Sequence, residues 1–150
     1  YCMRMIEDLP KHIIAKGTVD IRGELYGKGL IPARSQRLAA GHLRKKQPSG
    51  MGLSFCAFQI FDAKGTEVSN LQQLVKWGFH VCGYIKIDKD VVNRVKKLHS
   101  QWQDSLIFSR YPTDGIVVKV LDKDLQDKIG RTSIAPSWAT AIKDTWKKTW

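Results

Sequence analysis

The first regular pattern in the chain is an alternation of apolar or small residues with polar residues over residues 18–26. A period of two is typical of a strand that buries one face. Arg22 and Glu24 lie on the polar face of this predicted strand, because they are two residues apart. Residues 1–17 show only scattered apolar positions, interrupted by Pro10, and predict a connecting segment.

The next two patterns predict a basic helix and a buried strand. Leucine and alanine lie among five basic residues over residues 32–46, which predicts a short helix. The sequence Gln47-Pro48-Ser49-Gly50 predicts the end of that helix. Residues 53–61 are almost all apolar, which predicts a strand buried on both faces.

Further along, short apolar stretches recur at helical and at strand spacing. Ser69 is the predicted N-cap of a helix whose apolar residues continue to Gly78, where the glycine predicts its end. A longer helix is predicted to begin at Asp88 or Asp90. The other predicted elements are strands at 79–87 and 116–121, a short polar helix, and a final strand at 137–143.

This order of elements is not the regular alternation of strand and helix that a parallel sheet requires. The sequence therefore predicts an α+β fold with a mostly antiparallel sheet and flanking helices. With 150 residues, the chain is long enough to bury a core and corresponds to one domain or a large piece of one.

The charge balance indicates a class of partner. Lysine and arginine total 25 against 14 aspartate and glutamate residues, which gives a formal net charge of +11 at pH 7. An excess of this size favours a polyanion. We rank nucleic acid above an anionic membrane, because no apolar run approaches the length of a membrane-spanning helix and no basic tract adjoins one.

The cysteines give no sign of a disulfide framework or a zinc site. Cys2, Cys56 and Cys82 are odd in number and have no CxxC or Cys/His spacing. A reducing cytoplasm fits this usage best. The chain has no signal peptide and begins with Tyr1 rather than methionine, which fits a chain that begins inside a longer protein.

Three predicted strands carry charged residues that suit a nucleotide site. They contain the stretches Arg22-Gly23-Glu24, Asp114 to Lys119, and Trp138 to Lys143. Taken alone, each lysine of such a strand most often extends to solvent, and a lone Glu24 is an ordinary edge-strand charge. Together, on strands that lie side by side, two lysines would bind phosphate and the carboxylate would bind ribose hydroxyls.

Six stretches carry a family resemblance: DIRGELY, ARSQRLAAGHLR, LSFCAFQIF, LVKWGFHV, YPTDGIVVKV and IGRTSIAPSWATAIK, in that order. They resemble the adenylation domain of NAD-dependent DNA ligases, from about Met5 to Lys143. ATP-dependent ligases and capping enzymes share the nucleotidyltransferase plan, but the arginine-rich AAG stretch and the tryptophan before the last lysine favour the NAD-dependent branch. The resemblance implies an ATP-grasp-like nucleotidyltransferase fold, with residues 1–143 as the C-terminal part of that domain and residues 144–150 as a divergent tail or linker toward an absent OB fold.

The resemblance also implies a reaction. In the family, a lysine attacks the α-phosphate of NAD, expels nicotinamide mononucleotide and forms lysyl-AMP. The AMP then passes to the 5′-phosphate at a nick, and the 3′-hydroxyl displaces it to seal the strand. NAD and Mg²⁺ are the implied cofactors, and nicked duplex DNA and the missing ligase domains of the parent chain are the implied partners.

The nucleophile of the family is missing from this sequence. It lies in a Lys-x-Asp-Gly motif, and neither Lys11 nor Lys16 is followed by Asp-Gly. We therefore expect no catalytic nucleophile within these 150 residues and no activity from them alone. The alternatives are a catalytically inactive DNA-binding remnant of such a ligase, or an RNA-end or capping nucleotidyltransferase.

Position by position, the resemblance implies nucleotide-binding roles. Glu24 matches the glutamate that binds the adenosine ribose. Lys119 matches the lysine that contacts the bound nucleotide, and Lys143 matches the last motif lysine, which pairs with the α-phosphate. Asp114 matches the acidic residue that helps to hold the metal and the phosphates.

For four further positions, the sequence leaves alternative roles open or departs from the family pattern. Arg22 either braces the site or forms a cross-strand salt bridge. Phe58 matches an aromatic ring stacked on adenine, and a core phenylalanine is the alternative. Gln103 occupies a position where an arginine is common, and Arg110 is a candidate substitute for that charge.

The predicted basic helix carries the implied DNA contacts. Arg34 and Arg44 match the segment that lies against the nicked strand in the family, and Arg37, Lys45 and Lys46 are further candidates for phosphate contacts. A solvated charge is the alternative for any one of these residues. Collectively they favour a DNA-facing surface.

Overall fold

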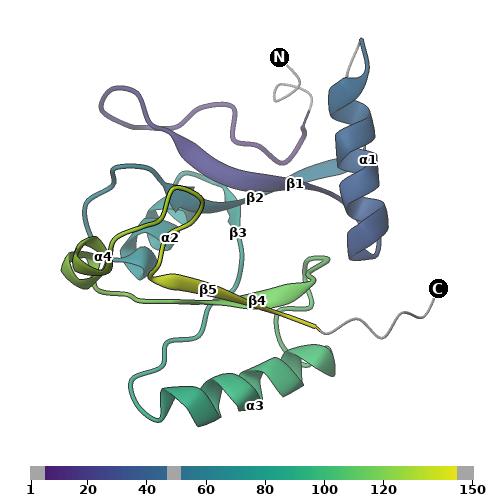
Figure 1. The fold of residues 1–150 in the computed structure, drawn as a ribbon. Helices are drawn as coiled ribbons and strands as arrows, with labels where there is room; N and C mark the ends of the chain where they lie inside the picture. The colour runs from purple at the N-terminus through teal and green to yellow at the C-terminus, as the bar shows by residue number, and fades with distance from the viewer. Residues whose placement is uncertain (1–5, 47–51, 145–150) are drawn as a thin grey trace. The chain divides into compact units, whose positions relative to one another are not determined.

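The computed structural model describes residues 6–46 and 52–144 (Figure 1). The chain divides into two compact units, Tyr1–Cys82 and Gly83–Trp150. Of the predicted elements, the Gln47 to Gly50 helix end and the tail from residue 145 lie outside the described residues. Each unit is described below by itself.

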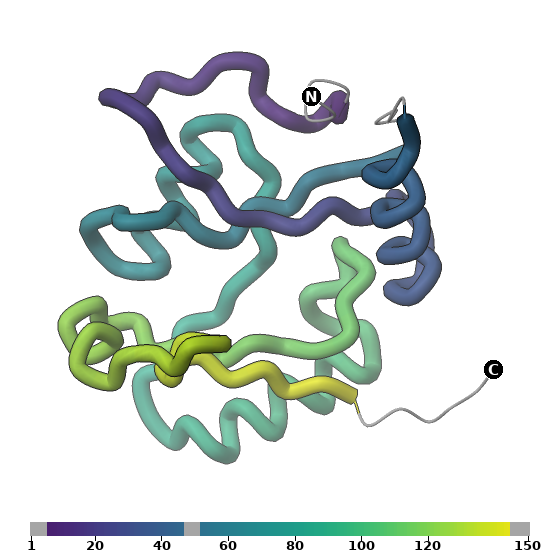
Figure 2. The backbone as a smooth tube through the Cα atoms, turned by 45° about the horizontal axis from the view of Figure 1, so that its top comes forward, coloured from purple at the N-terminus to yellow at the C-terminus, as the bar shows by residue number. Residues whose placement is uncertain are grey.

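The first unit is built on a small mixed sheet. Strand β1 (Ile21–Gly27) pairs antiparallel with β2 (Leu53–Ile60), and the two run alongside each other in Figure 2. Strand β3 (His80–Val81) joins the other edge of β2 in parallel. The predictions of a strand at 18–26 and of one at 53–61 are thereby confirmed, with the first beginning later than expected.

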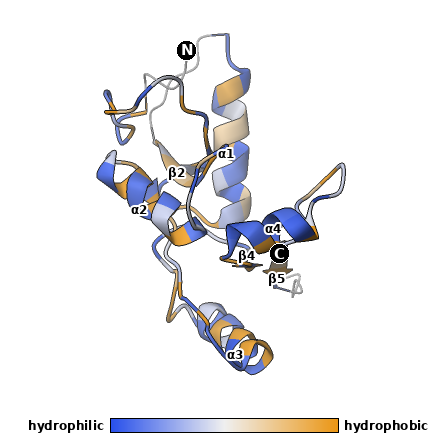
Figure 3. Cartoon of the chain, turned by 90° about the vertical axis from the view of Figure 1, so that its left-hand side faces the viewer, coloured by the Kyte–Doolittle hydropathy of each residue, from blue (hydrophilic) through white to orange (hydrophobic). Residues whose placement is uncertain are grey.

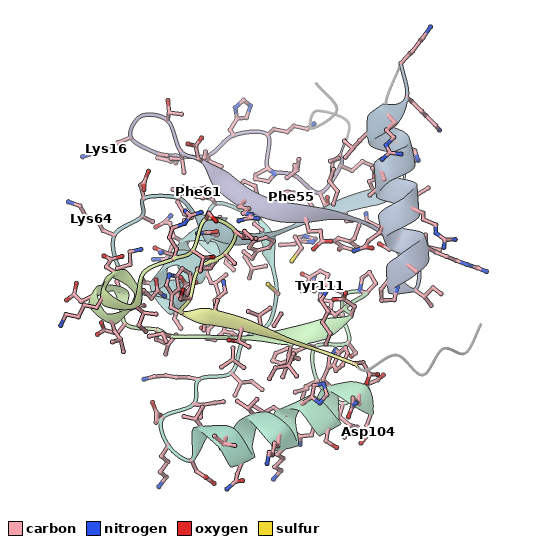
Figure 4. All side chains as sticks on the ribbon, in the orientation of Figure 1. Lys16, Phe55, Phe61, Lys64, Asp104 and Tyr111 are labelled. Carbon is pink, nitrogen blue, oxygen red and sulfur yellow. The ribbon has the colours of Figure 1, made fainter. Side chains whose placement is uncertain are left out.

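The core of the first unit lies on one face of this sheet. Phe55 and Ala57 of β2 are buried there together with Ile6 and Leu74. Phe79 meets Phe55, labelled in Figure 4, edge to face with 6.3 Å between the ring centroids. Because Leu74 belongs to α2 (Glu67–Lys76), this helix covers the apolar face, and Arg22 and Glu24 are exposed on the opposite face.

The N-terminus of α2 corrects one prediction. Thr66, not Ser69, is the N-cap residue. The Thr66 hydroxyl accepts a hydrogen bond from the Ser69 amide at 3.1 Å, and the Ser69 hydroxyl accepts one from the Thr66 amide at 2.9 Å. Ser69 is therefore the third helical residue of a reciprocal capping box, a role normally taken by glutamate or glutamine.

Helix α1 (Pro32–Arg44) packs against β1 through its small residues. Ser35 and Ala39 are buried, and the Ser35 hydroxyl accepts a buried hydrogen bond of 2.7 Å from the Gly27 amide. This bond fixes the start of the helix to the end of β1. The predicted helix at 32–46 is confirmed, and the structure ends it two residues earlier.

The predicted strand at 79–87 is wrong for most of its length. Only His80 and Val81 form a ladder, and the following residues have no strand structure. The boundary between the two compact units falls after Cys82, inside the predicted strand. Tyr84 and Ile85 mimic a strand pattern, yet both side chains are exposed, because the segment has no neighbouring strand on which to bury them.

The second unit contains a two-stranded sheet and two helices. Strand β4 (Gly115–Lys119) pairs antiparallel with β5 (Ala139–Lys143). Helix α3 (Val91–Gln103) packs against β4, and α4 (Lys123–Ile129) is a mostly hydrophilic connection between the strands (Figure 3). These elements confirm the predicted strands at 116–121 and 137–143 and the short polar helix between them.

Two polar contacts define the ends of α3. Asp90 is its N-cap residue, but with a left-handed backbone (φ of 51°) and without a side-chain bond to the helix backbone. Its carboxylate instead accepts a hydrogen bond of 2.9 Å from the Asn93 amide group. At the other end, the Trp102 indole donates to the Thr113 hydroxyl at 2.8 Å, which ties α3 to the segment that enters β4.

The fold class predicted from the sequence is confirmed. Helices and strands are mixed along the chain, and two of the three strand pairings among the described residues are antiparallel. The strands that carry Glu24 and the two motif lysines belong to two separate sheets rather than one. None of the helices in the described ranges is long and apolar enough to cross a bilayer.

Candidate nucleotide-binding and DNA-facing surfaces

The open face of the first sheet carries the charged residues of β1. Arg22 and Glu24 are exposed, whereas Gly23 between them faces the core. A β-carbon on Gly23 would overlap the Phe55 ring and the Cys56 carbonyl oxygen, so only glycine fits at this bulge. The bulge follows Arg22 directly and shifts the register between the two strands.

Phe58 lies on the same open face as Arg22. The Arg22 guanidinium carbon is 6.0 Å from the centroid of the Phe58 ring, a cation–π distance. Phe58 is half-buried and stands outside the buried core cluster of the described residues. The contact that the structure gives Arg22 is therefore an aromatic ring rather than a carboxylate, and it brings together two of the residues predicted to bind the nucleotide.

In the second unit, Asp114 and Lys143 form an ion pair. The Asp114 Oδ2 atom is 3.2 Å from Lys143 Nζ, and the side chains are 44% and 63% exposed. Gly115 pairs directly with Lys143 across the ladder. A β-carbon on Gly115 would lie 2.5 Å from the Ile142 carbonyl oxygen and 2.9 Å from Lys143 Cα. Glycine therefore permits the close strand approach on which the ion pair depends.

Lys119 lies on the same face as Lys143 but at the opposite end of the ladder. Lys119 pairs with Ala139, four residues from Lys143 along β5, which separates the two positions by about 13 Å at the usual strand rise. Between them the face presents small apolar side chains, and Val117 is 58% exposed. The register thus places a lysine at each end of an apolar strip.

The C-terminus of α3 meets the same end of the ladder as Lys143. The Gln103 side-chain amide donates to Asp144 Oδ1 at 2.8 Å, and the Asp144 backbone amide donates to the Asp114 carbonyl at 3.3 Å. Arg110, the candidate substitute for an arginine at Gln103, lies instead over the Tyr111 ring at 5.6 Å. Asp144 was not among the residues predicted from the sequence, because it follows the last recognisable motif.

The predicted DNA-facing residues project from α1. Arg34, Arg37 and Arg44 are exposed, and so is Lys45, the C-cap residue. By helical geometry the three arginines lie on the side opposite the buried Ser35 and Ala39. The first turn of the helix contains no acidic residue. The three arginines therefore point away from β1, against which the opposite side of α1 packs.

A groove of about 660 Å³ lies beside α2 in the first unit. Its lining includes Lys16, Phe61, Lys64, Asn70 and Trp77, and Figure 4 shows both lysine side chains pointing outward. None of the site residues predicted from the sequence lines this groove. Its mixture of cationic, aromatic and amide groups does not single out one ligand chemistry.

A magnesium ion fits the described residues only in combination with a ligand. No group of three or more histidine, cysteine, aspartate or glutamate side chains in the described part of the chain is arranged to hold a metal. Mg²⁺ is usually bound by one or two carboxylates together with substrate phosphates and water. Asp114, half-exposed and already paired with Lys143, suits such a shared site.

Comparison with known proteins identifies the family. A family model for the NAD-dependent DNA ligase adenylation domain matches residues 28–145, which include α1, β4, β5 and the Asp114–Lys143 pair. The chain belongs to this family. The matched range begins after Glu24, so Arg22 and Glu24 lie outside it.

The curated relatives that the chain resembles are DNA ligases. The DNA ligase of Cytophaga hutchinsonii is 32% identical over 149 residues, covering 89% of this chain and 22% of the relative. The DNA ligase of Halothermothrix orenii is 28% identical over 163 residues, covering 94% of this chain and 24% of the relative. The DNA ligase of Thermobifida fusca is 31% identical over 136 residues, covering 85% of this chain and 18% of the relative. This chain of the adenylation-domain family therefore spans about a quarter or less of each relative.

Proposed function

We propose that this chain supplies nucleotide-binding and DNA-binding surfaces to an NAD-dependent DNA ligase, which seals 5′-phosphate/3′-hydroxyl nicks in duplex DNA through lysyl-AMP and DNA-adenylate intermediates. The observation that carries the proposal is the open face of β4 and β5, within the family match, with Lys119 and Lys143 at its two ends. NAD provides the adenylyl group for this chemistry.

The two lysines have different roles in this proposal. Lys143 is held by Asp114 at 3.2 Å, so its ammonium group is oriented before a ligand arrives. Each phosphate of the NAD pyrophosphate is negatively charged, and its oxygens replace the carboxylate as partners of the exposed ammonium group. Lys143 then offsets the charge that develops on the α-phosphate, and Lys119 binds a phosphate oxygen at the other end of the face.

The residues of the first sheet bind the adenosine part in this proposal. Glu24 is exposed and accepts hydrogen bonds from ribose hydroxyls, for which a carboxylate with two acceptor oxygens is suited. Phe58 stacks on adenine, and Arg22, at cation–π distance from its ring, fixes the orientation of that ring. Released from Lys143, Asp114 contributes an oxygen ligand to Mg²⁺ shared with the phosphates.

The nucleophilic lysine comes from outside these residues in this proposal, because the chain contains no Lys-x-Asp-Gly motif. Incubation of the 150-residue chain with NAD radiolabelled in the adenylate is expected to leave no covalent label. Covalent label on the chain would contradict that part of the proposal. The Lys143→Ala variant is the matched control for any non-covalent retention of NAD.

The decisive experiment uses the whole open reading frame that contains this chain. The expressed parent protein is expected to form a covalent adenylate from NAD and to seal a nicked duplex, and Lys119→Ala is expected to impair both steps. If that frame encodes no Lys-x-Asp-Gly motif, the ligase proposal is wrong. The second candidate, a non-catalytic DNA-binding remnant, is favoured by the missing motif and would show DNA binding without adenylation.

A further inference from the structure

Helix α1 has an unexplained glycine in the middle of its basic side. At 100° per residue, Arg34, Arg37, Gly41 and Arg44 fall within a stripe about 80° wide. The stripe points away from the buried face of the helix, and all four residues are exposed. Gly41 lies between Arg37, four residues before it, and Arg44, three residues after it, so both arginines are its surface neighbours.

None of the usual reasons for a helical glycine applies to Gly41. It is not among the glycines with a positive φ, so no left-handed backbone requires it. A β-carbon built on it would meet no atom of the described residues within 4 Å, so none of those residues requires its small size. It precedes the last helical residue by three positions, so it is not the helix terminator. Glycine in a helix interior lowers helix stability relative to alanine, and no contact among the described residues offsets this loss.

The charges around Gly41 indicate a polyanion as the missing neighbour. Residues 25–61 contain six lysine and arginine residues and no aspartate or glutamate. The N-cap residue Ile31 makes no side-chain capping bond, and Arg34 and Arg37 repel each other at a spacing of three residues. A row of phosphates would relieve this repulsion. Helix α1 therefore lacks a side-chain N-cap bond, has glycine rather than alanine at position 41, and has like charges at Arg34 and Arg37.

We propose that Gly41 is the point at which the sugar-phosphate backbone of DNA comes closest to α1, with Arg37 and Arg44 contacting phosphates on either side of it. This inference rests on the DNA-binding part of the proposed function and adds Gly41 to it as a positioning residue. From Arg34 to Arg44 the helix rises about 15 Å. One DNA strand presents a phosphate about every 3.4 Å of helix axis, so the stripe spans several phosphates. Such contacts hold the duplex in place without reading its sequence.

The test compares two leucine substitutions on the same helix. Gly41→Leu places a side chain inside the basic stripe, and Gln36→Leu places the same side chain on an exposed position about 140° away. Neither substitution changes the net charge. Binding of the 150-residue chain to a fluorescent nicked duplex is measured by anisotropy at low salt. Gly41→Leu is expected to weaken binding at least about tenfold, whereas Gln36→Leu leaves it unchanged.

A smaller substitution separates steric exclusion from loss of folding. Gly41→Ala is expected to raise the melting temperature, because alanine favours the helix, and to weaken DNA binding by a smaller factor than leucine. If both Gly41 variants bind as tightly as Gln36→Leu, the inference is wrong, even though the wild-type chain binds DNA. If the wild-type chain and an Arg37→Gln variant bind equally, or neither binds, the DNA-binding part of the proposed function fails as well.

Discussion

Replacing Gly115 with alanine tests how closely β4 and β5 must approach. The added β-carbon would lie 2.5 Å from the Ile142 carbonyl oxygen and 2.9 Å from Lys143 Cα. Both neighbours are backbone atoms of the paired strand, so they cannot rotate away as a side chain would. The strands must separate locally, and overpacking of this kind costs about 1–3 kcal/mol.

The ion pair accounts for little of this cost. Asp114 and Lys143 are 44% and 63% exposed, so solvent screens their attraction, and exposed pairs contribute at most about 1 kcal/mol. Asp114→Asn, which removes the pair without adding a β-carbon, is therefore expected to destabilise the chain less than Gly115→Ala. The matched backbone control is Gly41→Ala, the same chemical change at a position where the added β-carbon would meet none of the described residues within 4 Å.

Hydrogen exchange gives the local measurement. The chain forms two compact units, so its unfolding need not occur in a single step. Exchange at the amides of β4 and β5 reports the opening free energy of this ladder directly. Gly115→Ala is expected to accelerate that exchange while amides of β1 and β2 are unchanged. If Gly115→Ala and Gly41→Ala leave the exchange of β4 and β5 equally slow, the reasoning about close strand approach is refuted.

Three other predictions follow from single contacts. Thr66→Ala removes the acceptor for the Ser69 amide and is expected to cost about 1 kcal/mol, measured by chemical denaturation; an unchanged midpoint would contradict the capping box. Lys143→Ala is expected to weaken binding of AMP to the 150-residue chain about tenfold or more by calorimetry, with Lys128→Ala on α4 as the control that keeps wild-type affinity. Arg44→Gln is expected to reduce the slope of log affinity for DNA against log salt by about 1, and an unchanged slope would remove Arg44 from the phosphate contacts.

Elements with a strong local signal could be predicted from the sequence. The alternation around Arg22 and the apolar run of β2 correctly predicted two strands, because a strand buried on one face alternates polar and apolar residues and a strand buried on both faces is apolar throughout. Ser69 was misplaced as the cap because Thr66 and Ser69 have interchangeable hydroxyls, and only the backbone angles decide which one precedes the helix.

Non-local features could not be predicted from the sequence. The segment after Val81 has apolar residues at strand spacing, but strand formation also requires a partner, and the division of the chain after Cys82 leaves it none. The bond between Gln103 and Asp144 joins residues 41 positions apart and belongs to no motif. For the candidate site, the charged residues could be proposed from the sequence, whereas the placement of Lys119 and Lys143 at opposite ends of the ladder follows only from the register of β4 and β5.

In each unit a helix packs on the sheet, and the charged residues predicted to form the site lie exposed or half-buried on the strands, which explains why they stand out in the sequence. In the first unit α2 covers the apolar face, and Arg22 and Glu24 lie on the other face. In the second unit α3 packs against β4, and Lys119 and Lys143 share the face on which Val117 is 58% exposed. An unpaired charge is too costly on a covered face, so charges that interrupt an apolar strand mark the face that the fold leaves open. Because each open face also borders on apolar groups, Phe58 in one unit and Val117 in the other, both offer what a nucleotide requires: a flat apolar surface edged by charge.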